Sequence, residues 1–356
     1  MRSIGAKWCS ESLTVPLAGP GRPPSCARPE KACSTISSCL PNPARRCSKV
    51  ARLPPRKARS THTFLFGEHS MYHVAVDIGG TFTDCVVTRA GRIMAATKSP
   101  STPDEPSQGV IDVLGVVAEQ LGIAVGELLD ETEFFIHGST VATNAILERK
   151  GPVTALLTTR GHEDTLIVGR VAQRVAGLSP SDYIDEYRLR KATPIVPRSR
   201  IVGINERIDV DGKVFAPLDE EQALAEVGKL VDAGVQSIAI CLLWAPANSR
   251  HERRLKDLIA QHFPGIPVAI SADVAPLIGE YERTVTTVLT AFLGPKIDAY
   301  LDLLAKRIRA LGFHRELLLV QATGGLTTSD GLKASPLLFL DSGPVAGVLG
   351  PVGPKL

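Results

Sequence analysis

The chain has 356 residues, of which 44% are hydrophobic and 22% charged, and its formal net charge is +3. This length is sufficient for about two or three domains, each with its own apolar core. No apolar run reaches the roughly 18 residues that a helix needs to cross a bilayer, so we expect no membrane partner.

The first 70 residues differ in composition from the rest of the chain. They carry 12 Lys and Arg against 3 Asp and Glu, whereas the remaining residues carry 28 against 34. The positive charge therefore belongs to this leader and does not indicate a nucleic-acid partner. The leader has no hydrophobic periodicity, so we predict that residues 1–70 are disordered. Its prolines argue against the alternative, an organellar transit peptide, because such a peptide forms an amphipathic helix.

Cysteine usage indicates a reducing compartment. Five of the seven cysteines lie in the leader, without the paired spacing of a zinc site. The other two, Cys85 and Cys241, are isolated within apolar, strand-like runs. Isolated thiols of this kind are typical of a reducing environment, so we expect a cytoplasmic protein.

From Met71 the sequence alternates between strand and helix patterns, and the first strands form a meander with short turns. The first helix begins after Pro103 and has apolar residues at helical spacing. Strands are expected at 72–77, 82–88, 92–98, 134–138 and 153–158. After the first helix, further helices are expected at 140–149 and 161–168. This β-β-β-α-β-α-β-α order is that of the ribonuclease-H-like lobe of the actin, Hsp70 and sugar-kinase ATPases. The predicted fold class is therefore α/β, with such a lobe at residues 71–200.

The rest of the chain is expected to form further units. Residues 169–200 lack periodicity and are predicted to be an irregular insertion of the first lobe. A small α/β subdomain is predicted at residues 201–275. Its strands are expected at 201–208, 237–243 and 268–271, and its helices at 217–233 and 249–262. Residues 276–356 begin another domain, in which Gly294-Pro295 is expected to separate two helices because proline breaks helices. These helices and the next strand are expected at 281–292, 297–311 and 316–321.

The stretch at residues 77–84 reads Asp-Ile-Gly-Gly-Thr-Phe-Thr-Asp and joins the first two strands. Glycine adopts backbone angles closed to other residues and leaves room for a ligand, so the turn can present N–H groups to an anionic oxygen. The threonine hydroxyls add donors, and the carboxylates of Asp77 and Asp84 are hard ligands of the kind that Mg²⁺ accepts. We predict a metal–triphosphate site here, and a plain β-hairpin is the alternative. The residues expected to form the site are Asp77, Gly79, Gly80, Thr81, Thr83 and Asp84.

A second polar cluster lies where the fourth strand meets the next helix. His137 ends the strand, and Ser139 and Thr140 follow at the helix start, where backbone N–H groups favour anions. Asn144 lies one turn further along the same helix face. We predict that these residues face the phosphates or the substrate carbonyl, with His137 as a candidate catalytic residue. A structural histidine is the alternative.

Two further groups are candidates. Glu280 and Arg283 are expected to form a charged catalytic group on the substrate side or an interlobe ion pair, with a solvated helix start as the alternative. Ser342 and Gly343 are expected at a close backbone approach beside the nucleotide, with a plain turn as the alternative. The histidines that lie among surface-like charges receive no predicted role, and they are His251, His262 and His314.

These motifs together resemble the N-terminal part of the hydantoinase A and ATP-dependent 5-oxoprolinase family, which also includes the acetone carboxylase β subunit. Their order and spacing hold from about residue 72 to residue 350. The first motif alone would also suit a sugar kinase. The matching stretches are residues 77–84, 137–151, 157–161, 276–284 and 342–348.

The resemblance implies an ATP-dependent hydrolase that opens a cyclic amide such as hydantoin or 5-oxoproline, or acts on a ketone. Its cofactors would be ATP and Mg²⁺. ATP phosphorylates a carbonyl oxygen in such enzymes, and this transfer depends on positioning and charge neutralisation. The resemblance also implies a partner of the hydantoinase B type.

The family pattern continues with a second phosphate hairpin, which does not occur before Leu356. We therefore expect that most of the second ATPase lobe is missing and that the chain, as a fragment, is inactive alone. Two alternatives remain open. One is a sugar-type kinase of the same fold, and the other is a non-catalytic fragment that only binds a partner.

Overall fold

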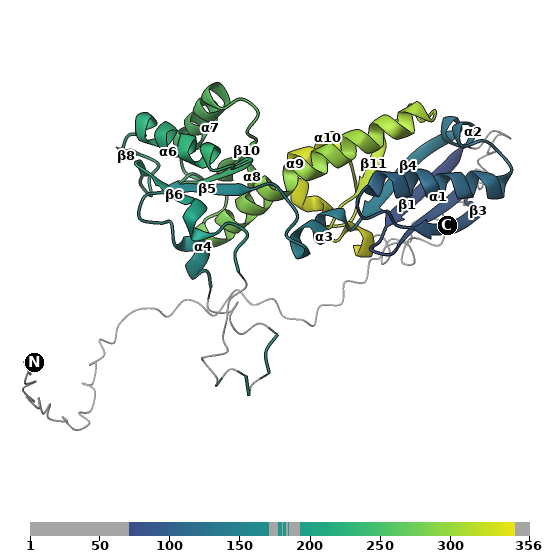
Figure 1. The fold of residues 1–356 in the computed structure, drawn as a ribbon, viewed down its shortest axis with the longest axis horizontal. Helices are drawn as coiled ribbons and strands as arrows, with labels where there is room; N and C mark the ends of the chain where they lie inside the picture. The colour runs from purple at the N-terminus through teal and green to yellow at the C-terminus, as the bar shows by residue number, and fades with distance from the viewer. Residues whose placement is uncertain (1–70, 171–176, 180, 183, 185–192, 346–356) are drawn as a thin grey trace, which may run out of the picture. The chain divides into compact units, whose positions relative to one another are not determined.

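The computed structural model describes residues 71–170, 177–179, 181–182, 184 and 193–345 (Figure 1). The predicted leader, half of the predicted insertion and the end of the last motif lie outside these residues. The described chain forms two main sheets, a two-stranded ribbon and several helices. Within this part of the chain, no helix is both long and apolar enough to span a membrane.

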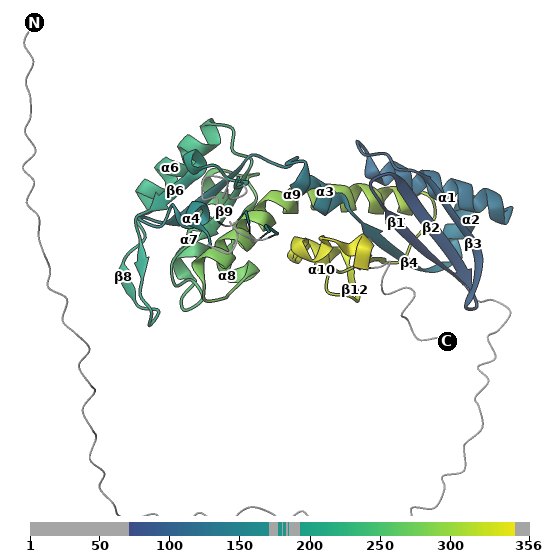
Figure 2. The same ribbon diagram turned by 90° about the horizontal axis from the view of Figure 1, so that it is seen from below.

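The larger sheet has the strand order β12-β11-β4-β1-β2-β3 (Figure 1, Figure 2). Strands β1, β2 and β3 form the predicted antiparallel meander, whereas β4 runs parallel to β1 and β11 runs parallel to β4. This is the arrangement that the sequence predicts for a ribonuclease-H-like lobe. The strands span β1 Tyr72–Ile78, β2 Phe82–Arg89, β3 Arg92–Pro100, β4 Thr132–Ser139, β11 Leu317–Val320 and β12 Leu326–Thr328.

The helices include most of those predicted and some that the sequence did not indicate. The predicted helix at 161–168 is only a single turn, α4, and the short helices α2 and α10 were not predicted. The helices span α1 Pro106–Leu121, α2 Val125–Asp130, α3 Val141–Leu147, α4 Thr165–Val168, α6 Glu220–Asp232, α7 Arg250–His262, α8 Ser271–Val274, α9 Glu280–Ala310 and α10 Ser329–Ala334, and the 3₁₀ turns span η1 Arg198–Arg200 and η2 Pro336–Phe339.

The two faces of the larger sheet have different environments. Successive side chains of a strand point to opposite faces, and alternate residues of β1 from Tyr72 to Ile78 are buried in one apolar core with residues of α1 and the second half of α9. Asp77 therefore points to the other face. Asp84 lies opposite it across the β1–β2 pair and points the same way.

The smaller sheet is parallel and has the order β10-β9-β5-β6. Its strands and the ribbon β7–β8 span β5 Thr154–Thr159, β6 Ile201–Ile204, β7 Arg207–Ile208, β8 Val214–Ala216, β9 Ser237–Cys241 and β10 Val268–Ile270. The sequence analysis assigned β5 to the first lobe, but β5 pairs with β6 and β9. All of its residues are buried, as in a central strand of a parallel sheet, and such a strand needs partners on both edges.

Helix α9 continues through Gly294-Pro295, so the prediction of two separate helices is wrong. Proline has no N–H, and the carbonyl of Ala291 therefore loses its helical donor. The hydroxyl of Ser237, on β9, donates to this carbonyl at 2.7 Å. The long helix is thus maintained by a contact with the smaller sheet that the local sequence does not reveal.

Candidate functional site

The turn between β1 and β2 is held by four backbone and hydroxyl contacts. Gly79 N–H donates to the Phe82 carbonyl at 2.9 Å, and Ser101 N–H donates to the Thr81 carbonyl at 2.9 Å. The Ser101 hydroxyl donates to the Gly79 carbonyl at 2.9 Å and lies 3.2 Å from the hydroxyl of Thr83, which is buried. Thr83 therefore stabilises the turn, whereas Thr81 is exposed and available to a ligand.

The two glycines of the turn were expected to adopt backbone angles closed to other residues, but neither has a positive φ. A Cβ at Gly79 would lie 3.0 Å from the Phe82 carbonyl oxygen, so this position is sterically restricted. A Cβ at Gly80 would meet nothing within 4 Å. Neither the fold nor the backbone angle requires glycine at position 80, and the space beside it remains open to a ligand.

Asp77 is the most unusual side chain of this site. Its Oδ1 atom is buried and has no hydrogen-bond partner. Burial, and secondly the negative charge of Asp84, raise the pKa of Asp77 above its ordinary value. A Cβ at Gly343 would lie 2.8 Å from Asp77 Oδ1, so only glycine allows the C-terminal segment to approach this carboxylate.

These residues fit a hydrated Mg²⁺ bound to a nucleotide. Mg²⁺ keeps several waters and usually takes one or two carboxylates plus phosphate oxygens. Asp77 provides an unpaired carboxylate oxygen, and Asp84 lies beside it on the same face. The described residues contain no group of three or more acidic, His or Cys side chains that could bind a metal by themselves. The donor set is therefore suited to a metal that arrives with phosphates.

The start of α3 lies next to the turn. Thr140 donates to the Ile78 carbonyl through its N–H at 3.0 Å and its hydroxyl at 3.1 Å. Asn144 donates to the Thr140 hydroxyl at 3.3 Å, which agrees with the predicted helix face. The carbonyl of Ser139 accepts a hydrogen bond of 2.9 Å from the hydroxyl of Ser342, which is buried. Ser342 therefore joins the C-terminal segment to β4.

A cavity of about 420 Å³ lies beside this turn. Gly79, Gly80, Thr140 and Asn144 line it, together with Tyr300 of α9. Asp77 does not line it, because that side chain points to the opposite face of the sheet. The structure thus gives the turn an open cavity on the side of α3, and the buried carboxylate of Asp77 lies on the other face of the sheet.

His137 does not face this site, although the sequence analysis predicted that it faces the phosphates or the substrate. Its side chain is fully buried in the core. Its Nδ1–H donates to the Val76 carbonyl at 3.2 Å, and Nε2 accepts the Tyr300 hydroxyl at 2.6 Å. Burial lowers the pKa of His137 to about 4, against the opposite effect of the bond to Val76. His137 is therefore a neutral core residue, and the structural alternative describes it better.

Glu280 and Arg283 also do not lie at the turn between β1 and β2. Arg283 is 1% exposed, and it donates to the carbonyls of Leu242 at 2.8 Å and Leu277 at 3.3 Å. Glu280 lines a separate pocket at the start of α9. Arg283 therefore binds loops of the smaller sheet and does not form the predicted substrate-side group with Glu280.

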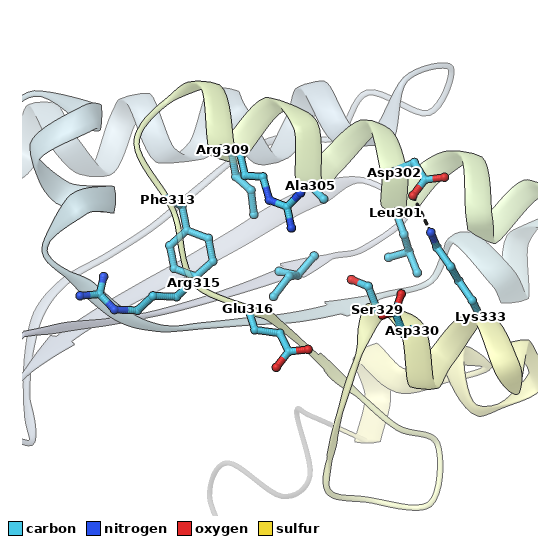
Figure 3. Close-up of a pocket in the computed structure, with 12 residues that line it drawn as sticks. Leu301, Asp302, Ala305, Arg309, Phe313, Arg315, Glu316, Ser329, Asp330 and Lys333 are labelled. Atoms are coloured by element: carbon cyan, nitrogen blue, oxygen red, sulfur yellow. Dashed lines mark hydrogen bonds and ion pairs between the residues drawn. The ribbon is translucent and has the colours of Figure 1, made fainter.

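Another pocket, between α9 and α10, contains none of the predicted site residues (Figure 3). Lys333 of α10 and Asp302 of α9 form an ion pair across it at 2.5 Å, as Figure 3 shows. Arg315 donates to the carbonyls of Asp130 and Thr132 at 3.1 and 2.8 Å. These three side chains are satisfied by contacts within the fold, so we assign this pocket no function.

Comparison with known proteins identifies relatives over most of the described chain. A family profile described as the hydantoinase/oxoprolinase N-terminal region matches residues 73–263, and one described as hydantoinase/oxoprolinase matches residues 283–353. The gamma subunit of acetophenone carboxylase from Aromatoleum aromaticum is 36% identical over 291 residues, which are 80% of this chain and 39% of that protein. The alpha subunit of caprolactamase from Pseudomonas jessenii is 32% identical over 275 residues, which are 77% of this chain and 39% of that protein.

A solved structure has the same fold. The nucleotide-free structure of acetone carboxylase, from work on ATP-dependent acetone carboxylation, is similar with a TM-score of 0.72 at 28% identity. The match covers 79% of this chain and 40% of that chain. The chain thus spans about two fifths of the length of these relatives.

Proposed function

This chain belongs to the hydantoinase/oxoprolinase family, and on that premise we propose that its β1–β2 turn binds the phosphates of ATP beside Asp77. The predicted resemblance and the predicted α/β fold class are both confirmed. The proposal rests above all on the buried Asp77 Oδ1, which has no partner and lies near the end of β1, next to the turn that leaves open space at Gly80. A buried carboxylate oxygen without a donor costs free energy, which a hydrated cation would offset.

The proposed reaction is transfer of the terminal phosphoryl group of ATP to a carbonyl oxygen. Bound Mg²⁺ would neutralise charge on the phosphate oxygens. Asp77 would orient the waters of the metal, the N–H groups of the turn would bind phosphate oxygens, and the exposed Thr81 hydroxyl would add a donor. For an amide, the new C–O–P linkage makes the carbonyl carbon a better electrophile, because amide resonance otherwise makes that carbon resist attack. ADP leaves, and the activated carbon becomes open to a nucleophile such as water.

We propose a cyclic amide, such as hydantoin or 5-oxoproline, or a ketone as the substrate. Caprolactamase and acetone carboxylase are named for compounds of these two classes. Both relatives are named as subunits, which supports a second subunit, of hydantoinase B type, as the partner. Because this chain spans 39% of those proteins, we propose the activity for the assembled enzyme and not for this chain alone.

Nucleotide binding provides the first test. Isothermal titration with Mg-ATP should show saturable binding that requires Mg²⁺ and weakens at least about tenfold in Asp77→Asn, because charge-assisted contacts are worth about 1.5–3 kcal/mol. Asp298→Asn is the matched control, since Asp298 on α9 also has a buried, unpartnered Oδ1 but does not lie at the turn. Equal loss of binding in the two variants, or no loss in Asp77→Asn, would contradict the assignment.

Turnover provides the second test. The chain, combined with its partner subunit, should release inorganic phosphate from ATP only when hydantoin, 5-oxoproline, caprolactam or acetone is present. Formation of a phosphorylated sugar would instead support the sugar-type kinase. Partner binding without any effect of nucleotide would support the non-catalytic role.

A further inference from the structure

A second polar site lies in a surface pocket lined by residues of α6 and α7. Figure 1 labels these two helices beside the smaller sheet. The pocket has a volume of about 660 Å³ and is lined by residues that include Glu220, Arg250, His251 and Asp257. None of these residues lines the cavity beside the hairpin. The sequence places His251 among surface-like charges, whereas in the structure only 8% of its side chain is exposed.

A buried carboxylate sets the orientation of the His251 ring. The side chain of Glu206 is fully buried, and its Oε2 lies 2.7 Å from His251 Nδ1. Its Oε1 accepts the Thr159 hydroxyl, whose oxygen in turn accepts the Leu243 N–H at 2.9 Å. With a proton on Nδ1, His251 donates to Glu206 Oε2 and presents Nε2 as an acceptor.

This arrangement leaves the lone pair of His251 Nε2 free. No described residue binds Nε2. Nε2 is also not among the buried polar atoms that lack a partner, so the exposed part of the ring includes it. A histidine with a carboxylate behind one ring nitrogen and a free lone pair at the other is suited to accept a proton or hydrogen bond from a ligand.

Three arginines of α7 line the pocket, and two of them are already paired with carboxylates. Arg254 binds Glu220 through two contacts of 2.7 Å, and Arg253 binds Asp273 at 2.9 Å. Arg250 is exposed and has no ion pair within the described part of the chain. Arg250 is therefore the cation that remains available to an incoming anion.

We propose that this pocket binds a small carboxylic acid that also carries an N–H or O–H group. Nε2 of His251 accepts that hydrogen, and Arg250 binds the carboxylate. Glu220 and Asp257 line the same pocket, so a single negative charge is better suited to it than a polyphosphate. The site does not depend on the proposed nucleotide function, because none of its residues belongs to the hairpin.

Three matched probes test the proposal on the full chain. N-acetylglycine has both groups, N-methylacetamide has only the N–H, and propionate has only the carboxylate. Long-range ¹H–¹⁵N NMR correlations report the protonation of the His251 ring, and His251→Gln identifies its signals. The neutral ring of the ligand-free protein should carry its proton on Nδ1. N-acetylglycine should shift the Nε2 signal and bind at least about tenfold more tightly than either fragment.

Variants separate a binding role from a structural one. Arg250→Gln should remove the tenfold advantage of N-acetylglycine. Arg253→Gln is the matched control on the same helix, because its partner is Asp273, and it should change affinity by less than about twofold. Glu206→Gln should move the ring proton to Nε2, since the new amide can donate to Nδ1.

The test does not depend on whether Glu206→Gln folds. Two other results decide the proposal: the protonation of the wild-type His251 ring, and the comparison of Arg250→Gln with Arg253→Gln. A wild-type ring protonated on Nε2 would overturn it. Two other results would also overturn it. One is that N-acetylglycine leaves the His251 signals unshifted, and the other is that it binds Arg250→Gln as tightly as the wild type.

Discussion

Ser237 stabilises the long helix α9 by donating a hydrogen bond to the carbonyl of Ala291, for which Pro295 has no N–H. The Ala291 carbonyl lacks an N–H donor from position 295, and the Ser237 hydroxyl donates to it at 2.7 Å. Ser237 is 1% exposed, so water cannot replace the hydroxyl. We predict that Ser237→Ala lowers the free energy of unfolding by about 2 kcal/mol, because a buried carbonyl without a donor costs about 1–3 kcal/mol.

Thermal and urea unfolding of the chain measure this effect. A loss of about 2 kcal/mol lowers the melting temperature by roughly 4–8 °C, since each kcal/mol shifts it by about 2–4 °C in a domain of 150–250 residues. Pro295→Ala restores an N–H at position 295. It should therefore be more stabilising in the Ser237→Ala background than in the wild type, by about 1 kcal/mol.

Thr290→Val is the matched control. The Thr290 hydroxyl donates to the Thr286 carbonyl at 2.9 Å, but that carbonyl also accepts the helical N–H of residue 290. Removing the hydroxyl should change stability by less than about 0.5 kcal/mol. The reasoning would be refuted if Ser237→Ala cost no more than Thr290→Val, or if the effects of Ser237→Ala and Pro295→Ala were additive.

Three further predictions concern the hairpin and the core beside it. Asp77→Asn should not lower the melting temperature of the nucleotide-free chain at neutral pH, and should raise it slightly: the pKa of Asp77 is raised on folding, so its charge opposes folding above that pKa. Scanning calorimetry measures this, and a clear drop would contradict it. Gly80→Ala should change nucleotide-free stability by less than about 0.5 kcal/mol but reduce the thermal shift produced by Mg-ATP, because the space at Gly80 is open only until a phosphate occupies it; an undiminished shift would place the phosphates elsewhere. The pKa of His137 is lowered to about 4 on folding, so its contribution to stability is complete above about pH 6.5 and is lost as pH falls from there to about 4, by roughly 1.4 kcal/mol per pH unit. Urea unfolding across this range should show a shallower pH dependence in His137→Gln, and an unchanged slope would show that another group titrates.

Local pattern was sufficient to predict the strands of the meander, the turn at residues 77–84 and the strand and helix that became β4 and α3. Alternation along β1 places Asp77 opposite the buried residues whichever helices cover the sheet. The five motif stretches between residues 77 and 348 were together sufficient to indicate the family, since each is contiguous in the sequence.

Tertiary structure alone decided which face of the sheet is covered, and hence that His137 meets Tyr300 in the core while Asp77 keeps an unpartnered oxygen. It also decided the continuity of α9 and the Glu206–His251 pair. Each of these depends on contacts between residues 45 or more positions apart. Periodicity and propensity act over a few neighbouring residues, so they cannot reveal which distant donor reaches a given acceptor.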